Sequence, residues 1–118
     1  MDYATEKKVV FAAMSKKNFY LREHIIKFIL QKNYSPTCAF MVYSYFLLDT
    51  VDRKKLISAN NDLIRRSDEL WVFGDISDGV GKEIILARKL GREVKYFKVI
   101  KRNLNFKEIV EKEAKSEL

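Results

Sequence analysis

Hydrophobic and polar positions along the chain form short apolar runs that are separated by amphipathic stretches. Apolar runs predict buried strands over residues 8–13, 69–73 and 93–100. A further strand is expected over residues 34–39, where Pro36 favours an edge position because proline cannot donate a ladder hydrogen bond.

The amphipathic stretches predict helices between these strands. Helical spacing of apolar residues predicts helices over residues 19–32, 52–66 and 79–90, followed by a charged helix over 105–116. Asn33 and Gly91 are suited to end two of them, because both residue types tolerate a left-handed backbone. Asp52 and Asn105 are expected to cap the starts of two others. Residues 14–18 are expected to form a polar loop.

The order of predicted elements is β-α-β-α-β-α-β-α, which indicates an α/β fold. Strands that alternate with helices of this length are typical of an open parallel sheet with helices on both faces. Right-handed crossovers narrow the expectation to a flavodoxin-like or Rossmann-like arrangement. A chain of 118 residues is expected to form one domain, residues 1–118.

The composition of the chain excludes some classes of protein and otherwise leaves the predicted fold unchanged. With 47% hydrophobic and 13% aromatic residues, the chain can bury a core, which excludes global disorder. Its one cysteine, Cys38, cannot form an internal disulfide, and no secretory leader pattern opens the sequence. The longest apolar run, residues 39–48, is too short to cross a bilayer. We therefore expect a cytoplasmic protein with no membrane partner.

The net charge of +7 comes from lysines and arginines spread along the whole chain. A nucleic-acid-binding protein usually concentrates such residues on one helix or arm, so nucleic acid is not the expected partner. Solvated helix faces are the favoured explanation. A positive surface would nevertheless attract phosphorylated or nucleotide-like ligands.

Helical phasing singles out Glu83 in the helix predicted over residues 79–90. At 100° per residue, Val80, Ile84 and Ala87 share one apolar arc, and Glu83 falls inside that arc. A glutamate near a helix start is favoured by the helix dipole, but that explanation predicts the solvent face. A carboxylate directed at the sheet is more often part of a functional site.

Asp78 directly precedes the same helix and is expected to act as its N-cap. The segment Gly79 to Gly81 presents backbone N–H groups at a helix N-terminus, where an anion can bind. It lacks the third glycine of a dinucleotide fingerprint and the Gly-Lys-Ser/Thr of a P-loop. In the preceding helix, predicted over residues 52–66, Asp62 is expected to form an i,i+4 ion pair with Arg66.

Other reactive side chains carry no recognisable motif. His24 is the only histidine, and neither it nor Cys38 has metal-ligand spacing around it, so no metal site is expected. Consecutive asparagines, Asn60 and Asn61, are costly in a helix by propensity, which suggests that their side-chain hydrogen bonds matter.

Three segments of the chain resemble motifs of the nucleoside 2-deoxyribosyltransferase superfamily, in particular of its short relatives. They are Asn61-Asp62-Leu63, residues 70–73, and Asp78-Gly79-Val80-Gly81-Lys82-Glu83. In that family an Asn-Asp-Leu on a helix precedes a hydrophobic strand, and Asp-Gly-x-x-x-Glu opens the next helix. The likeness covers most of residues 7–100.

This resemblance implies cleavage or exchange of the N-glycosidic bond of a nucleoside or nucleotide, without a cofactor. Glu83 would be the nucleophile that attacks the anomeric carbon, while Asp78 and Asp62 would hold the base and assist its protonation. Contacts with the substrate are also expected, from Ser15, Arg22, Asn61, Gly79 and Gly81. Family active sites are shared between subunits, so a homo-oligomer is expected.

Two alternatives stay open at this point. The chain could be a non-catalytic module that binds or senses nucleotides, or a protein associated with nucleic acid. The segment 40–48, ambiguous between a helix and an extended loop, is expected to promote self-association because it is apolar.

Overall fold

The structure, a computed structural model, describes residues 6–38 and 50–116. The expectation for residues 40–48 lies outside this described part. The strands are β1 (Val9–Met14), β2 (Ser35–Thr37), β3 (Glu69–Phe73), β4 (Glu93–Ile100) and β5 (Asn105–Ile109). The helices are α1 (Arg22–Gln31), α4 (Arg53–Arg65) and α5 (Asp78–Lys89), with 3₁₀ turns η1 (Lys16–Leu21) and η2 (Glu111–Glu113).

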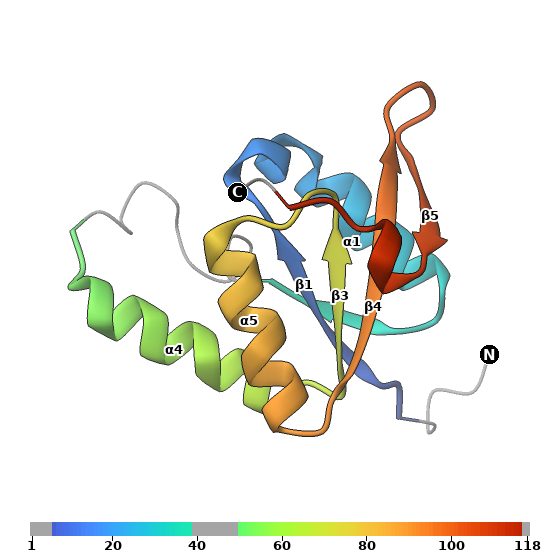
Figure 1. Ribbon diagram of the computed structural model, residues 1–118. Coiled ribbons are helices and arrows are strands. Elements are labelled where there is room, and N and C mark those ends of the chain that lie inside the picture. Colours follow the sequence, from blue (N-terminus) through green and yellow to red (C-terminus); the bar gives the residue numbers. More distant parts are fainter. Residues whose placement is uncertain (1–5, 39–49, 117–118) are drawn as a thin grey trace.

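The strands form one sheet in the order β2-β1-β3-β4-β5 (Figure 1). The first four strands are parallel, and β5 pairs with β4 in the antiparallel direction. This is the flavodoxin-like strand order, with an antiparallel strand at one edge. The expected α/β fold with an open parallel sheet is therefore confirmed, as is the edge position of the strand that contains Pro36.

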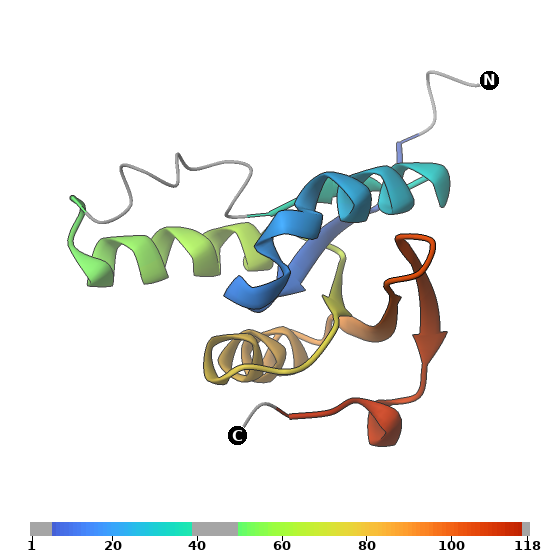
Figure 2. The same cartoon turned by 90° about the horizontal axis from the view of Figure 1, so that it is seen from above.

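Helices cover both faces of the sheet, as Figure 2 shows from above. On one face α1 packs on an aromatic core in which the Phe28 ring contacts those of Phe73, Phe97 and Phe106. On the other face α4 and α5 contribute Ile64, Val80, Ile84 and Ala87 to a second core. Side chains alternate between these two cores along β1 and β3, because both strands are central and buried on both faces.

The prediction of a helix over residues 105–116 is wrong. Residues 105–109 form β5, and its Phe106 is only 6% exposed in the aromatic core beneath α1. Phe106 and Ile109 belong to opposite cores, which an extended strand permits because successive side chains point to opposite faces. A turn in which Leu104 has a φ of 52° reverses the chain between β4 and β5.

Smaller differences concern the ends of elements. The expected polar loop after β1 is largely a 3₁₀ helix, η1, and α1 begins at Arg22 rather than at residue 19. Asn33 and Gly91 both have positive φ, 68° and 72°, as expected for helix-ending residues. Asp52 caps α4 by accepting a hydrogen bond from the Lys54 N–H at 3.0 Å, also as expected.

The last described residues run back along the face that carries α5. The N–H of Ile76, in the loop between β3 and α5, donates to the Lys115 carbonyl at 2.7 Å. Arg88 of α5 pairs with Glu111 and donates to the Tyr96 hydroxyl. The hydrogen bond to Glu111 raises the pKa of Arg88, and burial raises the pKa of Tyr96. These contacts fix the C-terminal segment against α5 and against the loop that leads into it.

None of the described helices is long and apolar enough to cross a membrane.

Candidate active site

A cavity of about 620 Å³ lies at the carboxyl end of β1, beside the start of α5. Met14 at the end of β1 pairs with Phe73 at the end of β3, so both strands end at the same edge of the sheet. From β1 the chain crosses one face to reach β2, and from β2 it crosses the other face to reach β3. Ligands of open α/β sheets bind where successive connections diverge in this way.

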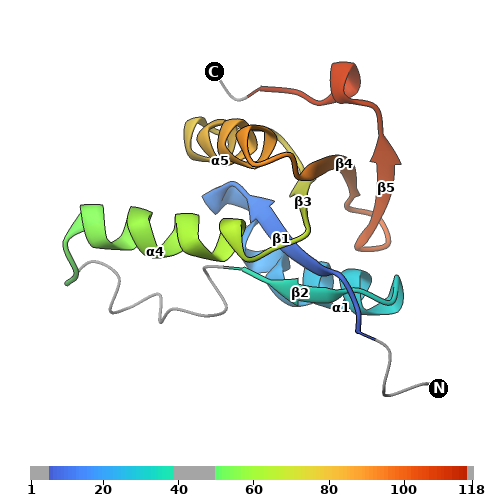
Figure 3. The ribbon, with the colours of Figure 1, turned by 90° about the horizontal axis from the view of Figure 1, so that it is seen from below.

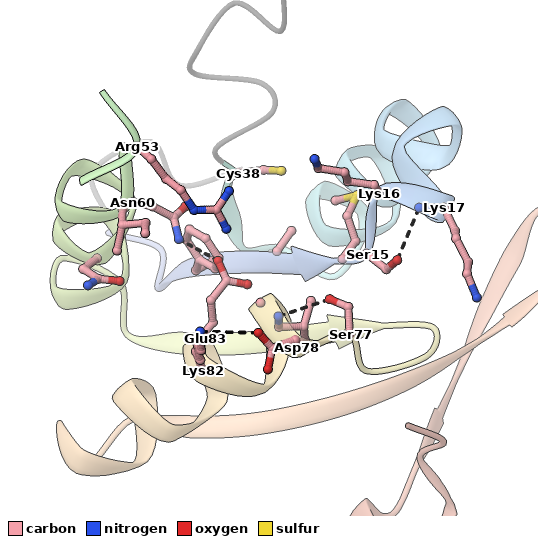
Figure 4. A pocket seen from close by; sticks show the side chains of 17 residues that line it. Ser15, Lys16, Lys17, Cys38, Arg53, Asn60, Ser77, Asp78, Lys82 and Glu83 are labelled. Carbon is pink, nitrogen blue, oxygen red and sulfur yellow. Dashed lines mark hydrogen bonds and ion pairs between the residues drawn. The ribbon is translucent and has the colours of Figure 1, made fainter. Parts of the chain in front are cut away.

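Three parts of the chain supply the polar lining of this cavity (Figure 4). The polar lining residues are Ser15, Lys16 and Lys17 after β1, Arg53, Asn60 and Asn61 of α4, and Ser77, Asp78, Lys82 and Glu83 around the start of α5. Phe11, Ile57 and Val80 are among its apolar lining residues. Apolar surface with a few convergent polar groups is typical of sites for small molecules.

Glu83 extends from α5 into this cavity, towards α4, and is partly buried. The amide of Asn60 donates a hydrogen bond to a Glu83 carboxylate oxygen at 2.6 Å. Burial raises the pKa of the Glu83 carboxyl from 4.5 to about 7, although the hydrogen bond from Asn60 acts in the opposite direction. The expected position of Glu83 on the inward arc of its helix is confirmed, and near neutral pH both of its protonation states are populated.

Asp78 lies in the first turn of α5 and lines the same cavity, but it is not the N-cap. Ser77 takes that position, and its hydroxyl accepts a hydrogen bond from the Val80 N–H at 3.2 Å. The Asp78 carboxylate instead pairs with Lys82 one turn later, at 3.3 Å. The expected cap is therefore wrong by one residue, because the serine hydroxyl serves as a helix cap as well as a carboxylate does.

The structure does not bring Asp62 to the cavity. Its side chain is exposed on α4 and pairs with Arg65 at 2.7 Å, rather than with Arg66 as expected. Asn61, its neighbour in the motif, does line the cavity. The two asparagines therefore lie on the cavity side of α4, and Asp62 lies on the solvent side.

The expected substrate-contacting residues divide into two groups. Ser15, Asn61 and Gly79 line the cavity, whereas Arg22 and Gly81 do not. The Arg22 guanidinium instead lies over the Phe19 ring, 4.2 Å from its centroid, and donates to the Phe19 carbonyl.

Sequence reasoning missed five polar side chains of the cavity, Lys16, Lys17, Arg53, Ser77 and Lys82. Nothing in the sequence separates Lys16 and Arg53 from the other basic residues on the surface. Asn60 was indicated only by the cost of consecutive asparagines in a helix. Across residues 6–38 and 50–116, no group of three or more histidine, cysteine or acidic side chains is placed to hold a metal ion.

Comparison with known proteins assigns the chain to a family. It belongs to the family described as "Domain of unknown function (DUF7768)", whose model matches residues 9–97. The search of curated proteins found no match.

Two solved structures share the fold. The CMP N-glycosidase BcmB of Clostridium botulinum aligns with a TM-score of 0.57 and 22% identity, over 83% of this chain and 75% of that protein. The 2-desoxiribosyltransferase of Leishmania mexicana aligns with a TM-score of 0.56 and 17% identity, over 79% of this chain. The chain spans only 65% of the length of the Leishmania protein. The resemblance noted in the sequence is therefore supported at the level of the fold.

Proposed function

We propose that this protein cleaves or exchanges the N-glycosidic bond of a nucleoside or nucleotide, with Glu83 as the nucleophile. The observation that carries the proposal is the placement of Glu83 in the cavity, where Asn60 holds one carboxylate oxygen at 2.6 Å. The names of the two structural neighbours, an N-glycosidase and a deoxyribosyltransferase, support this reaction class. The whole chain would then act as a single domain of this superfamily.

In the proposed reaction, an ionised oxygen of Glu83 attacks the anomeric carbon of the sugar. The bond from that carbon to the base breaks, and its electron pair leaves with the base, which takes up a proton. Asp78 is the cavity carboxyl that can guide this proton, since it lies in the same lining. Water or a second base then attacks the anomeric carbon and gives up a proton, while the bond from that carbon to the Glu83 oxygen breaks and its electron pair restores the carboxylate.

Asn60 would orient the nucleophile in this scheme. The hydrogen bond fixes one oxygen of Glu83 and favours its charged form, which is the form that attacks. Asp62, which the resemblance places beside Asp78, would reach a substrate only after leaving its ion pair with Arg65.

The test is release of free base from a panel of nucleosides and nucleoside monophosphates, measured by chromatography. We expect release by the wild-type protein, a loss of at least about 1,000-fold in Glu83→Gln, and no loss in Glu23→Gln, a matched change at an exposed glutamate of α1. Mass spectrometry of the acid-quenched reaction should detect a sugar adduct on the peptide that contains Glu83.

Base release that persists in Glu83→Gln would exclude Glu83 as the nucleophile. Ligand binding without base release in the wild-type protein would instead identify a nucleotide-binding module.

A further inference from the structure

The carboxylates that line the cavity all lie on one of its walls. Both lining carboxylates, Glu83 and Asp78, come from α5. The opposite side carries Lys16, from the start of η1, and Arg53, from the start of α4 (Figure 4). A substrate in this cavity therefore meets both carboxylates on the α5 side, where Lys82 pairs with Asp78, and Lys16 and Arg53 on the other side.

The two cations are not neutralised by acidic residues of the described chain. Asp78 pairs with Lys82 on its own helix, at 3.3 Å. Neither Lys16 nor Arg53 forms an ion pair within residues 6–38 and 50–116. Two charged groups on the same side of a cavity, each without a counter-ion in the described part of the chain, favour an anionic ligand group.

We propose that Lys16 and Arg53 bind the phosphate of the substrate, so that the substrate class is a nucleoside 5′-monophosphate rather than a free nucleoside. This inference rests on the proposed function, because it takes Glu83 as the group that faces the anomeric carbon. Arginine binds phosphate through two parallel hydrogen bonds, and lysine adds a compact positive charge.

The geometry of a nucleotide fits the two walls. The base leaves from the anomeric carbon, whereas the 5′-phosphate is attached on the other side of the ring oxygen. A sugar with its anomeric carbon at Glu83 can therefore direct its phosphate away from α5. Separation from the α5 carboxylates also reduces the repulsion between them and the phosphate. A cavity of about 620 Å³ lies within the range of sites that hold ligands of this size.

The experiment compares each nucleoside with its own 5′-monophosphate as a substrate for base release. We expect kcat/KM to be about 30-fold higher or more for the monophosphate, mainly through a lower KM, because charge-assisted hydrogen bonds to the phosphate are made in the bound state. Arg53→Met should lower this preference about 10-fold, and Lys16→Met combined with Arg53→Met should abolish it.

The control is Lys55→Met, which removes one positive charge from the exposed surface of the same helix without touching the cavity. It should leave the preference for the monophosphate unchanged. An equal effect of Lys55→Met and Arg53→Met would assign the preference to the net charge of the protein and overturn the inference. Equal kcat/KM for nucleosides and monophosphates would overturn it directly.

Binding separates failure of this inference from failure of the proposed reaction. Isothermal titration calorimetry uses the same ligand pairs and needs no turnover. Tighter binding of the monophosphate that is lost in Arg53→Met would uphold the phosphate site even if no base is released. Binding that is indifferent to the phosphate, or absent for both ligands, would overturn the site whatever the reaction.

Discussion

Asn60 of α4 and Glu83 of α5 are joined by a hydrogen bond of 2.6 Å that crosses the cavity between two helices. The two residues are 23 positions apart in the sequence, with the central strand β3 between them. Because of this contact, the protonation of the Glu83 carboxyl depends on the position of α4.

The first prediction concerns the pH dependence of base release. If Glu83 must be ionised to attack, kcat/KM should rise with pH through about 7, the pKa to which burial raises this carboxyl. Asn60→Ala removes the hydrogen bond that favours the charged form, so the rise should move to higher pH. Asn103→Ala, at an exposed asparagine in the turn after β4, should leave the profile unchanged. A rate that falls through the same pH range would indicate that Glu83 acts as an acid instead.

The second prediction concerns stability. The pKa of Glu83 is higher in the folded protein than its value of 4.5 in the unfolded chain, so the folded state binds this proton more tightly. The contribution of the Glu83 carboxyl to the free energy of unfolding is therefore complete below pH 4.5 and is lost as pH rises through about 7. Glu83→Gln should raise the free energy of unfolding by about 2 kcal/mol at pH 8.5 and by almost nothing at pH 4. Urea denaturation at both pH values measures this, and an equal effect at both would contradict a titrating cause.

The third prediction tests the antiparallel strand β5. Phe106 lies in the aromatic core with its ring centroid 5.2 Å from those of Phe28 and Phe73, so Phe106→Ala should cost about 3 kcal/mol of stability. Lys107→Ala, at the next position, where the side chain is exposed, should change stability by less than about 0.5 kcal/mol. Chemical denaturation gives both values. Comparable losses in the two variants would contradict a strand that buries Phe106 and exposes Lys107.

The fourth prediction concerns Gly74, which follows β3 with a φ of 85°. A Cβ atom at this position would lie 2.3 Å from the amide nitrogen of Asn18, which donates to the Phe73 carbonyl. Gly74→Ala should therefore destabilise the protein by about 2 kcal/mol, through the disfavoured backbone and the lost hydrogen bond. Thermal unfolding measures the loss, with Gly79→Ala as the control, since a Cβ there would meet no atom within 4 Å from other described parts of the fold. Similar losses in the two variants would contradict the close approach of Asn18.

Most of the sheet was predictable because its central strands, β1 and β3, are buried on both faces and appear in the sequence as short apolar runs. The exception was β5, where Phe106 and Ile109 are three positions apart. That spacing fits one face of a helix as well as the two faces of a strand, so only pairing with β4 decides between them.

Within the site, Glu83 was predictable because helical phasing placed a charge among core positions. Its partner Asn60 was only suggested, since a hydrogen bond between two helices depends on how they pack. Lys16 and Arg53 could not be distinguished from the many other basic residues, because a lysine at a cavity and a lysine in solvent have the same local sequence pattern. Figure 3 shows that α4 reaches well beyond the edge of the sheet, so the position of its first residues depends on how the helix packs.

The way in which α4 is anchored has a consequence for ligand binding. Ile64, near its C-terminal end, is its only buried residue, whereas Arg53 is its first residue, eleven positions away and exposed. Asn60 lies between them and is held by its hydrogen bond to Glu83, so the location of the guanidinium depends on the stiffness of the helix from Arg53 to Asn60. A substitution that weakens this helix without touching the cavity, such as Ser58→Gly, would lower the affinity for the proposed anionic ligand. A bound ligand would in turn stiffen the first turns of α4.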